Sequence, residues 1–135
     1  MSPDQPRAQA VRDRYQQVFG SVPDAIERRL AVAQASDRME AVEAIENLRR
    51  VLLGSNPLPP RVQQLVHFGQ LLALGREGPA RLHARAALRA GASLADLVGV
   101  VETSLVTAGM PAYGLGVDIL AELDEGAPEQ RGASS

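Results

Sequence analysis

The chain has 135 residues, of which 45% are hydrophobic and only 3% aromatic, and its formal net charge is −2. That length suits one domain, and a charge so near zero gives no electrostatic reason to expect nucleic acid as a partner. Because the sequence has no cysteine and two distant histidines, we exclude thiol catalysis and expect no metal site. No apolar run approaches the roughly 20 residues that cross a bilayer, and the N-terminus lacks the apolar segment of a signal peptide. We therefore expect a cytoplasmic protein that does not bind membranes.

Short helices with clear ends are predicted in the first third of the chain. Residues 1–8 contain two prolines among polar residues, and we predict a disordered tail there. A short helix is expected over residues 11–19, because its apolar residues share one side and Gly20 follows it. The next helix is expected over residues 23–35, where Pro23 suits a first turn.

A longer helix is predicted over residues 38–53. Asp37 and Glu40 have the spacing of a capping box, in which two side chains bond to each other's backbone N–H groups at the start of a helix. The apolar side of this helix is expected to consist of Val42, Ile45, Leu48 and Leu52. Gly54 ends the helix, and the prolines after it force the chain to turn.

The fourth predicted helix, residues 60–75, carries the first of the two histidines. Its buried side is expected to consist of Val62, Leu65, Val66, Gly69, Leu72 and Ala73. Gln64 and His67 lie on another face and are three residues apart, so they can share one pocket or one patch of solvent. A surface or boundary histidine without a chemical role is the alternative interpretation of His67.

The fifth predicted helix, residues 79–90, carries the second histidine in an alanine-rich stretch. At about 100° per residue, Arg81, Arg85 and Arg89 form one stripe, which we expect to face solvent. His83 points away from that stripe, toward alanines that let another helix come close or leave room for a small ligand. The alternative interpretation is a core or interface histidine that makes one hydrogen bond and has no chemical role.

A sixth helix, residues 93–108, is predicted from the capping box of Ser93 and Asp96 and from Gly109 after its end. Glu102 lies next to the apolar side of this helix. A carboxylate kept dry there is a candidate substrate-binding group, whereas one at the edge of the stripe would be paired or hydrated.

A last helix is predicted over residues 112–123, and residues 124–135 are predicted to form a second disordered tail. Because no alternation with period two appears, the sequence predicts an all-α fold. We expect a single-domain helical bundle of six or seven helices over residues 9–123.

Several short motifs of the chain occur together in one known family. They are ALGRE at 73–77, an LH..AAL..GAS run at 82–93, AGMPA at 108–112 and an earlier FGSVP at 19–23. With these motifs the chain resembles the carboxymuconolactone decarboxylase family over most of residues 15–123. The resemblance implies the all-α fold and, less specifically, the reaction.

The family has two branches, and the resemblance implies the one without cysteines. In the alkylhydroperoxidase-like branch a Glu, a CxxC pair and a His act together. Aligned on His83, the Glu position is Gln64 here, and the two cysteine positions are Arg76 and Pro79. A peroxidase needs a thiolate nucleophile, so that chemistry is excluded. The decarboxylase branch keeps the histidine and acts on a small lactone carboxylate without metal or organic cofactor, as a homo-oligomer.

Several polar positions of the decarboxylase branch are changed in this chain. Gln63 stands where that branch usually has Arg, and Gly99 stands where it has Glu. Thr103 and Thr107 replace a usual Gln and Tyr, and an AAN-like sequence is usual at residues 112–114. These changes favour an altered substrate more than an altered fold.

The expected function is that of a cofactor-independent lyase of the decarboxylase type, acting on a small organic acid or lactone. His83 would donate the proton to the enolate that remains after loss of CO2, and Arg76 would hold the carboxylate and the developing oxyanion. Gln64 and His67 would position the ring of the substrate, and Tyr113 would cover it.

Two alternatives are left open by the sequence. The first is an isomerase or cyclase of specialised metabolism that keeps the pocket and changes the reaction. The second is a non-catalytic oligomeric binding protein. In each case we expect a homo-oligomer, a trimer or hexamer, because the alanine-rich helices leave apolar surface to cover.

Overall fold

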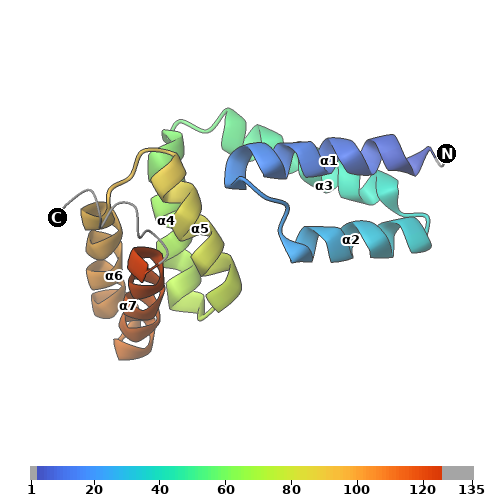
Figure 1. Cartoon of the computed structure of the whole chain (residues 1–135). Coiled ribbons are helices and arrows are strands. Elements are labelled where there is room, and N and C mark those ends of the chain that lie inside the picture. Colours follow the sequence, from blue (N-terminus) through green and yellow to red (C-terminus); the bar gives the residue numbers. More distant parts are fainter. Residues whose placement is uncertain (1–2, 126–135) are drawn as a thin grey trace. The chain divides into compact units, whose positions relative to one another are not determined.

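The computed structural model describes residues 3–125, and every regular element in that part of the chain is a helix (Figure 1). Seven helices follow one another, so the predicted all-α fold of six or seven helices is confirmed. Contacts divide the chain into two compact units, Met1–Pro57 and Leu58–Ser135, each with its own core. The single domain expected over residues 9–123 stays a prediction.

The first unit consists of α1 (Asp4–Phe19), α2 (Asp24–Ala35) and α3 (Met39–Gly54). Both α1 and α2 pack against α3. Their core is made of small and medium side chains with one tyrosine: Ala8, Val11, Tyr15, Ile26, Leu30, Ala33, Met39 and Val42.

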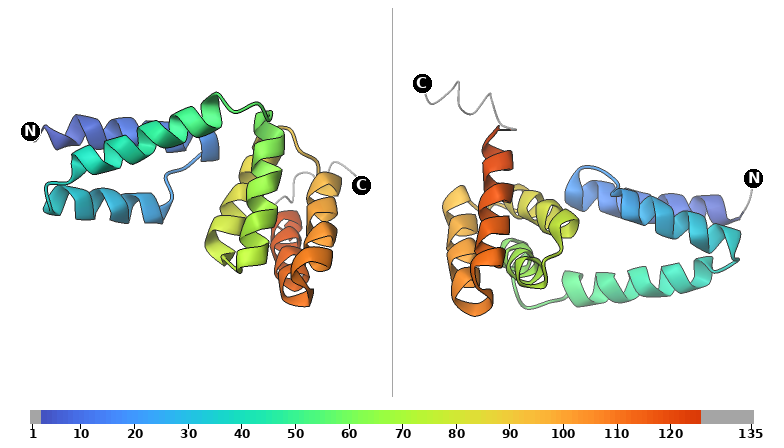
Figure 2. Two further views of the ribbon diagram at one scale, coloured as in Figure 1. Left: turned by 180° about the vertical axis from the view of Figure 1, so that it is seen from behind. Right: turned by 90° about the horizontal axis from the view of Figure 1, so that it is seen from below.

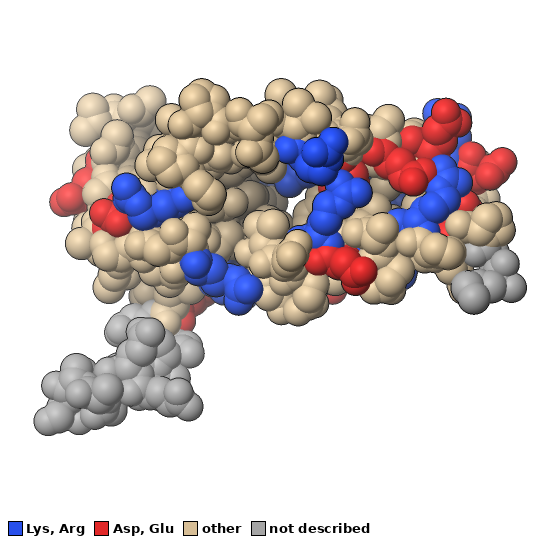
Figure 3. All heavy atoms as spheres, turned by 90° about the horizontal axis from the view of Figure 1, so that it is seen from above, with Lys and Arg blue, Asp and Glu red and all other residues tan. Residues whose placement is uncertain are grey.

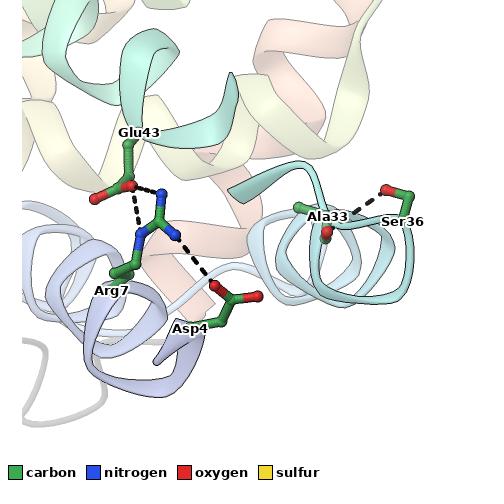
Figure 4. A network of polar contacts seen from close by, with 5 residues as sticks. All are labelled: Asp4, Arg7, Ala33, Ser36 and Glu43. Atoms are coloured by element: carbon green, nitrogen blue, oxygen red, sulfur yellow. Dashed lines mark hydrogen bonds and ion pairs between the residues drawn. The ribbon is translucent and has the colours of Figure 1, made fainter. Parts of the chain in front are cut away.

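The tail predicted for residues 1–8 is a helix from Asp4 onward, so this prediction was wrong for residues 4–8. Asp4 lies in the first turn, where a negative charge is favourable, and a proline is tolerated that close to a helix start. The side chain of Ala8 is fully buried, and Arg7 forms an ion pair with Glu43 of α3 and another with Asp4 at 3.2 Å (Figure 4). These tertiary contacts stabilise a segment whose composition alone suggested disorder.

Of the four residues predicted to form the apolar side of α3, only Val42 is buried. Ile45, Leu48 and Leu52 are 49%, 56% and 56% exposed. The buried residues of the helix are instead Met39, Val42 and Glu46. Burial of Glu46 follows from its partner, since the Tyr15 hydroxyl of α1 donates a hydrogen bond of 2.8 Å to its carboxylate.

The predicted capping box at the start of α3 is absent, because Asp37 belongs to the end of α2. Asp37 has a φ of 58°, in the left-handed region. The backbone N–H of Arg38 donates to the carbonyl of Ala33 at 2.7 Å, which closes α2 in a Schellman motif. The α3 helix therefore starts after Arg38 without a side-chain cap.

The second unit consists of α4 (Pro60–Leu74), α5 (Glu77–Arg89), α6 (Leu94–Ala108) and α7 (Met110–Glu125). The α4 helix packs against all three others, and α6 lies beside α7 (Figures 1 and 2). Three buried alanines of α5 allow the close approach: Ala80, Ala84 and Ala87. Larger side chains of the other helices complete the core: Phe68, Leu72, Leu97, Val101, Ile119 and Leu120.

In the second unit, the predicted start of α6 was confirmed, whereas the predicted buried side of α4 was only partly correct. The capping box of α6 is present, with both bonds between Ser93 and Asp96 at 3.0 Å. On α4, Leu72 is buried as predicted, but Val66 and Ala73 are exposed. Phe68 and Gln63 take their places, because the contacts with three neighbouring helices set the buried side. Of the tail predicted from residue 124 onward, the first two residues end α7 and the rest lies outside the described residues.

Charge is mixed on the surface. On the face that Figure 3 shows, acidic side chains lie beside basic ones, in agreement with the ion pairs between helices. Within residues 3–125, no helix combines the length and apolar character that a bilayer span requires.

Candidate functional site

Three polar side chains that the sequence singled out come together between α4 and α5. The Nδ1 atom of His83 lies 2.7 Å from Oε1 of Gln64, a hydrogen-bond distance. The ring of His67 stacks on that of His83, with 4.4 Å between centroids and 24° between planes. One helix thus supplies Gln64 and His67, three residues apart, and the other supplies His83.

All three side chains are half-buried. Imidazole rings at this depth are in contact with protein on one side and keep part of their surface in water. His83 is therefore not sealed in the core, whereas an interface histidine that makes one hydrogen bond stays the plainer interpretation.

The ends of α4 and α5 fix the positions of these side chains. Pro59 and Pro60 set the start of α4, and the side-chain amide of Gln63 donates to the carbonyl of Leu58 at 2.7 Å. Gly75, in the left-handed region, ends α4. The N–H of Arg76 then bonds to the carbonyl of Leu71 at 2.9 Å and leads the chain into α5.

Arg76 lies at the N-cap of α5 and is exposed. It precedes His83 by seven residues, which corresponds to nearly two full turns and about 10 Å along the axis, so both lie near one side of α5. Within the described residues, its guanidinium has no hydrogen-bond or ion-pair partner to hold it elsewhere.

Glu102 and Tyr113 lie outside this constellation. Glu102 is exposed on α6, which matches the edge position considered for it. Tyr113 of α7 is half-buried and packs against the core of the second unit. No ring contact or hydrogen bond in the described part of the chain joins either residue to the two histidines.

Arg81 was predicted to face solvent, but it links two helices. Its guanidinium bonds to Glu122 of α7 at 2.7 Å and to Glu77 of α5 at 2.6 Å. The hydrogen bond from Arg81 holds the pKa of the Glu122 carboxyl below its usual range. This ion pair ties α5 to α7 on a side of α5 other than that of His83.

The comparison with protein families decides which family this is. The family model "Carboxymuconolactone decarboxylase family" matches residues 39–122, more than half of the chain. The chain belongs to the carboxymuconolactone decarboxylase family. Its fold is similar to that of a crystal structure from Burkholderia xenovorans LB400, described as a candidate carboxymuconolactone decarboxylase. The TM-score is 0.74 with 20% sequence identity, over 94% of this chain and 98% of the other. None of the curated proteins matches the chain.

Within this member of the carboxymuconolactone decarboxylase family, the three candidate residues on α4 and α5 were named from the sequence, but their contacts with one another were not predicted. The three-residue spacing of Gln64 and His67 correctly placed them on one face. Their approach to His83 depends on how α4 packs on α5, which periodicity does not determine. Among residues 3–125, no three His, Asp or Glu side chains converge in a way that could hold a metal ion.

Proposed function

We propose that this family member is a cofactor-independent lyase of the carboxymuconolactone decarboxylase type, with a small organic acid or lactone as substrate and His83 as proton donor. The observation that supports this most is the placement of His83. It is half-buried, bonded through one ring nitrogen to Gln64 and stacked on His67. A ring held in this way keeps a constant orientation.

The proposed reaction needs one proton donor and one cation. The bond between the carboxylate carbon and its neighbour breaks, CO2 leaves, and the electron pair passes into an adjacent carbonyl to give an enolate. The His83 imidazolium then gives its proton to the carbon that lost CO2, and the neutral ring takes a new proton from water. Imidazole suits this task because it exchanges protons near neutral pH.

Arg76 is the proposed cation for the substrate carboxylate and the developing oxyanion. Its place at the start of α5, near the side of the helix that carries His83, supports this role. A substrate bound by both would lie along the first two turns of α5. Tyr113 and Glu102 stay proposals as substrate contacts, and Gln64 is already engaged with His83.

A second candidate function is supported by the pairing of two imidazoles. An isomerase that moves a double bond or opens a ring takes a proton from one atom and gives one to another. The stacked rings of His67 and His83 could share these two steps. Such an enzyme would change the substrate without releasing CO2.

A substrate panel tests both candidates. Wild type would be incubated with small lactone carboxylates, carboxymuconolactone among them, and CO2 release and product structure would be followed by NMR. We expect CO2 release that is lost in His83→Gln and kept in Arg89→Gln, an exposed residue of the same helix. Isomerised product without CO2 would favour the second candidate, and CO2 release at the wild-type rate by His83→Gln would contradict the proposal.

A further inference from the structure

The geometry of Gln64 points to a role other than the contact with the substrate ring that the sequence suggested for it. We propose that Gln64 is a positioning residue that keeps the proton of the neutral His83 ring on Nδ1, so that Nε2 is the nitrogen that exchanges a proton with the substrate. The second half of this inference rests on the proposed function. The first half, the position of the ring proton, does not.

The orientation of the Gln64 amide is the observation from which the tautomer is inferred. The Gln64 atom that faces His83 is Oε1, which lies 2.7 Å from Nδ1. A carbonyl oxygen only accepts hydrogen bonds, so Nδ1 must be the donor and must carry the proton. In the neutral ring, the other nitrogen then carries the lone pair.

An amide in this position behaves differently from a carboxylate. The side chain of Gln64 neither gains nor loses a proton, so it accepts the same bond from Nδ1 whether the ring is neutral or charged. No proton can pass from His83 through Gln64. The only ring nitrogen that can give and take a proton during a reaction is therefore Nε2.

His67 restricts the ring from a second direction. It stacks on the face of His83 at 4.4 Å, while Gln64 bonds to its edge. A half-turn of the ring would exchange Nδ1 with a carbon atom and break the bond to Gln64. Edge and face are thus both held by α4, which makes one ring orientation more stable than its alternative.

NMR of the full-length chain tests this directly. The chain has only two histidines, so a long-range correlation spectrum of the ring nitrogens contains two sets of signals, and the His83→Gln variant identifies the set of His67. At about pH 8, where an ordinary imidazole is neutral, we expect His83 to show a protonated Nδ1 and an unprotonated Nε2. A wild-type His83 with its proton on Nε2 would overturn the proposal.

Variants of Gln64 separate positioning from folding. In Gln64→Leu we expect the Nε2 signal to move toward the protonated position, because the acceptor at Nδ1 is gone. The same substitution at Gln70, an exposed residue of α4, should leave both ring signals unchanged. Gln64→Glu should keep the proton on Nδ1 and move the titration midpoint of His83 to higher pH, since a carboxylate stabilises the charged ring.

The outcomes keep this inference distinct from the proposed function. An unchanged His83 spectrum in Gln64→Leu would refute the positioning role, whatever the turnover. If His83→Gln kept full turnover while the spectra were as expected, the proposed function would fail and the tautomer assignment would stand. If both hold, Gln64→Leu should lower kcat more than it raises KM, because ring orientation matters most in the proton-transfer step.

Discussion

Glu46 shows at the scale of one residue how a partner decides burial. It is 5% exposed, although a carboxylate is seldom buried without compensation. The Tyr15 hydroxyl donates to it at 2.8 Å, and the guanidinium groups of Arg29 and Arg49 lie within 3.9 Å. The acid is therefore stabilised on the buried side of α3, which the apolar pattern had predicted to carry Ile45 and Leu48 instead.

The same contact predicts how stability changes at alkaline pH. Burial, and then the hydrogen bond to Glu46, raises the pKa of the Tyr15 hydroxyl above its ordinary value. The folded chain thus holds this proton more tightly than the unfolded chain. The stabilisation is present below the unfolded value of about 10 and is lost as the pH rises through the folded-state pKa.

We therefore expect the free energy of unfolding of the wild type to fall as the pH is raised above about 10. The chain contains neither cysteine nor lysine, so few other groups titrate in that range. Urea unfolding curves measured from about pH 8 to about pH 11, on both sides of the ordinary tyrosine pKa of about 10, measure the effect. In Tyr15→Phe the fall should be smaller, and an equal fall in both proteins would show that Tyr15 is not its source.

The residues of the site were predictable from the sequence to a limited depth. His83 followed from its motif, and Gln64 and His67 from their shared face. The hydrogen bond and the ring stacking join two helices, and no spacing within one helix encodes them. Arg81 illustrates the same limit, because its partner Glu122 is 41 residues away.

At the scale of helices, the two glycines of α7 have opposite roles. A Cβ added to Gly116 would lie 2.5 Å and 2.9 Å from the two methyl carbons of Val101 and 3.2 Å from Leu72. A Cβ at Gly114 would meet nothing within 4 Å. Gly116 therefore permits the contact of α7 with α6 and α4, whereas Gly114 only loosens the helix.

Alanine at these two positions should change stability in opposite directions. For Gly116→Ala we expect a loss of about 1–3 kcal/mol in the free energy of unfolding, since Val101 is branched and cannot easily turn aside. For Gly114→Ala we expect a gain of up to about 1 kcal/mol from the better helix propensity of alanine. Urea unfolding of both variants measures the difference, and destabilisation of similar size in both would contradict the packing argument.

Two pairs of residues with the spacing of a capping box behave differently, and the neighbouring helix ends explain why. Ser93 and Asp96 have the spacing of a capping box and form one. Asp37 and Glu40 have the same spacing, yet α2 uses Asp37 to end itself. The two helices share a turn too short for separate end and start residues, so one signal displaces the other. Predictions of ends therefore fail where two helices compete for one residue.

At the scale of the whole molecule, the all-α fold followed from composition and periodicity, and the family from its motifs. The buried side of single helices was less predictable. Tertiary contacts moved the core of α3 from Ile45 and Leu48 to Glu46, and the start of α1 from the predicted residue 11 back to Asp4. Both differences arise where a polar pair, rather than an apolar one, joins two helices.

The apolar residues left exposed on α3 favour self-association. Ile45, Leu48 and Leu52 recur at helical spacing and are about half exposed. We expect wild type to be a homo-oligomer, a trimer or hexamer, because a face of this kind is normally covered. Light scattering after size exclusion measures the mass.

Leu48→Glu should shift that mass toward the monomer, whereas Asn47→Glu, an exposed neighbour on the same helix, should not. A wild type that runs as a monomer over a wide concentration range would contradict the expectation. An unchanged mass in Leu48→Glu would place the interface elsewhere on the molecule.

The proton donated by His83 is the step on which the proposed chemistry depends most. Its most direct test is kcat/KM for CO2 release by His83→Gln, measured beside wild type and Arg89→Gln on the best substrate of the panel. We expect kcat/KM to fall at least about 100-fold in His83→Gln. In Arg89→Gln we expect kcat/KM to change by less than about twofold. A His83→Gln enzyme as active as wild type would contradict the assignment of His83 as proton donor.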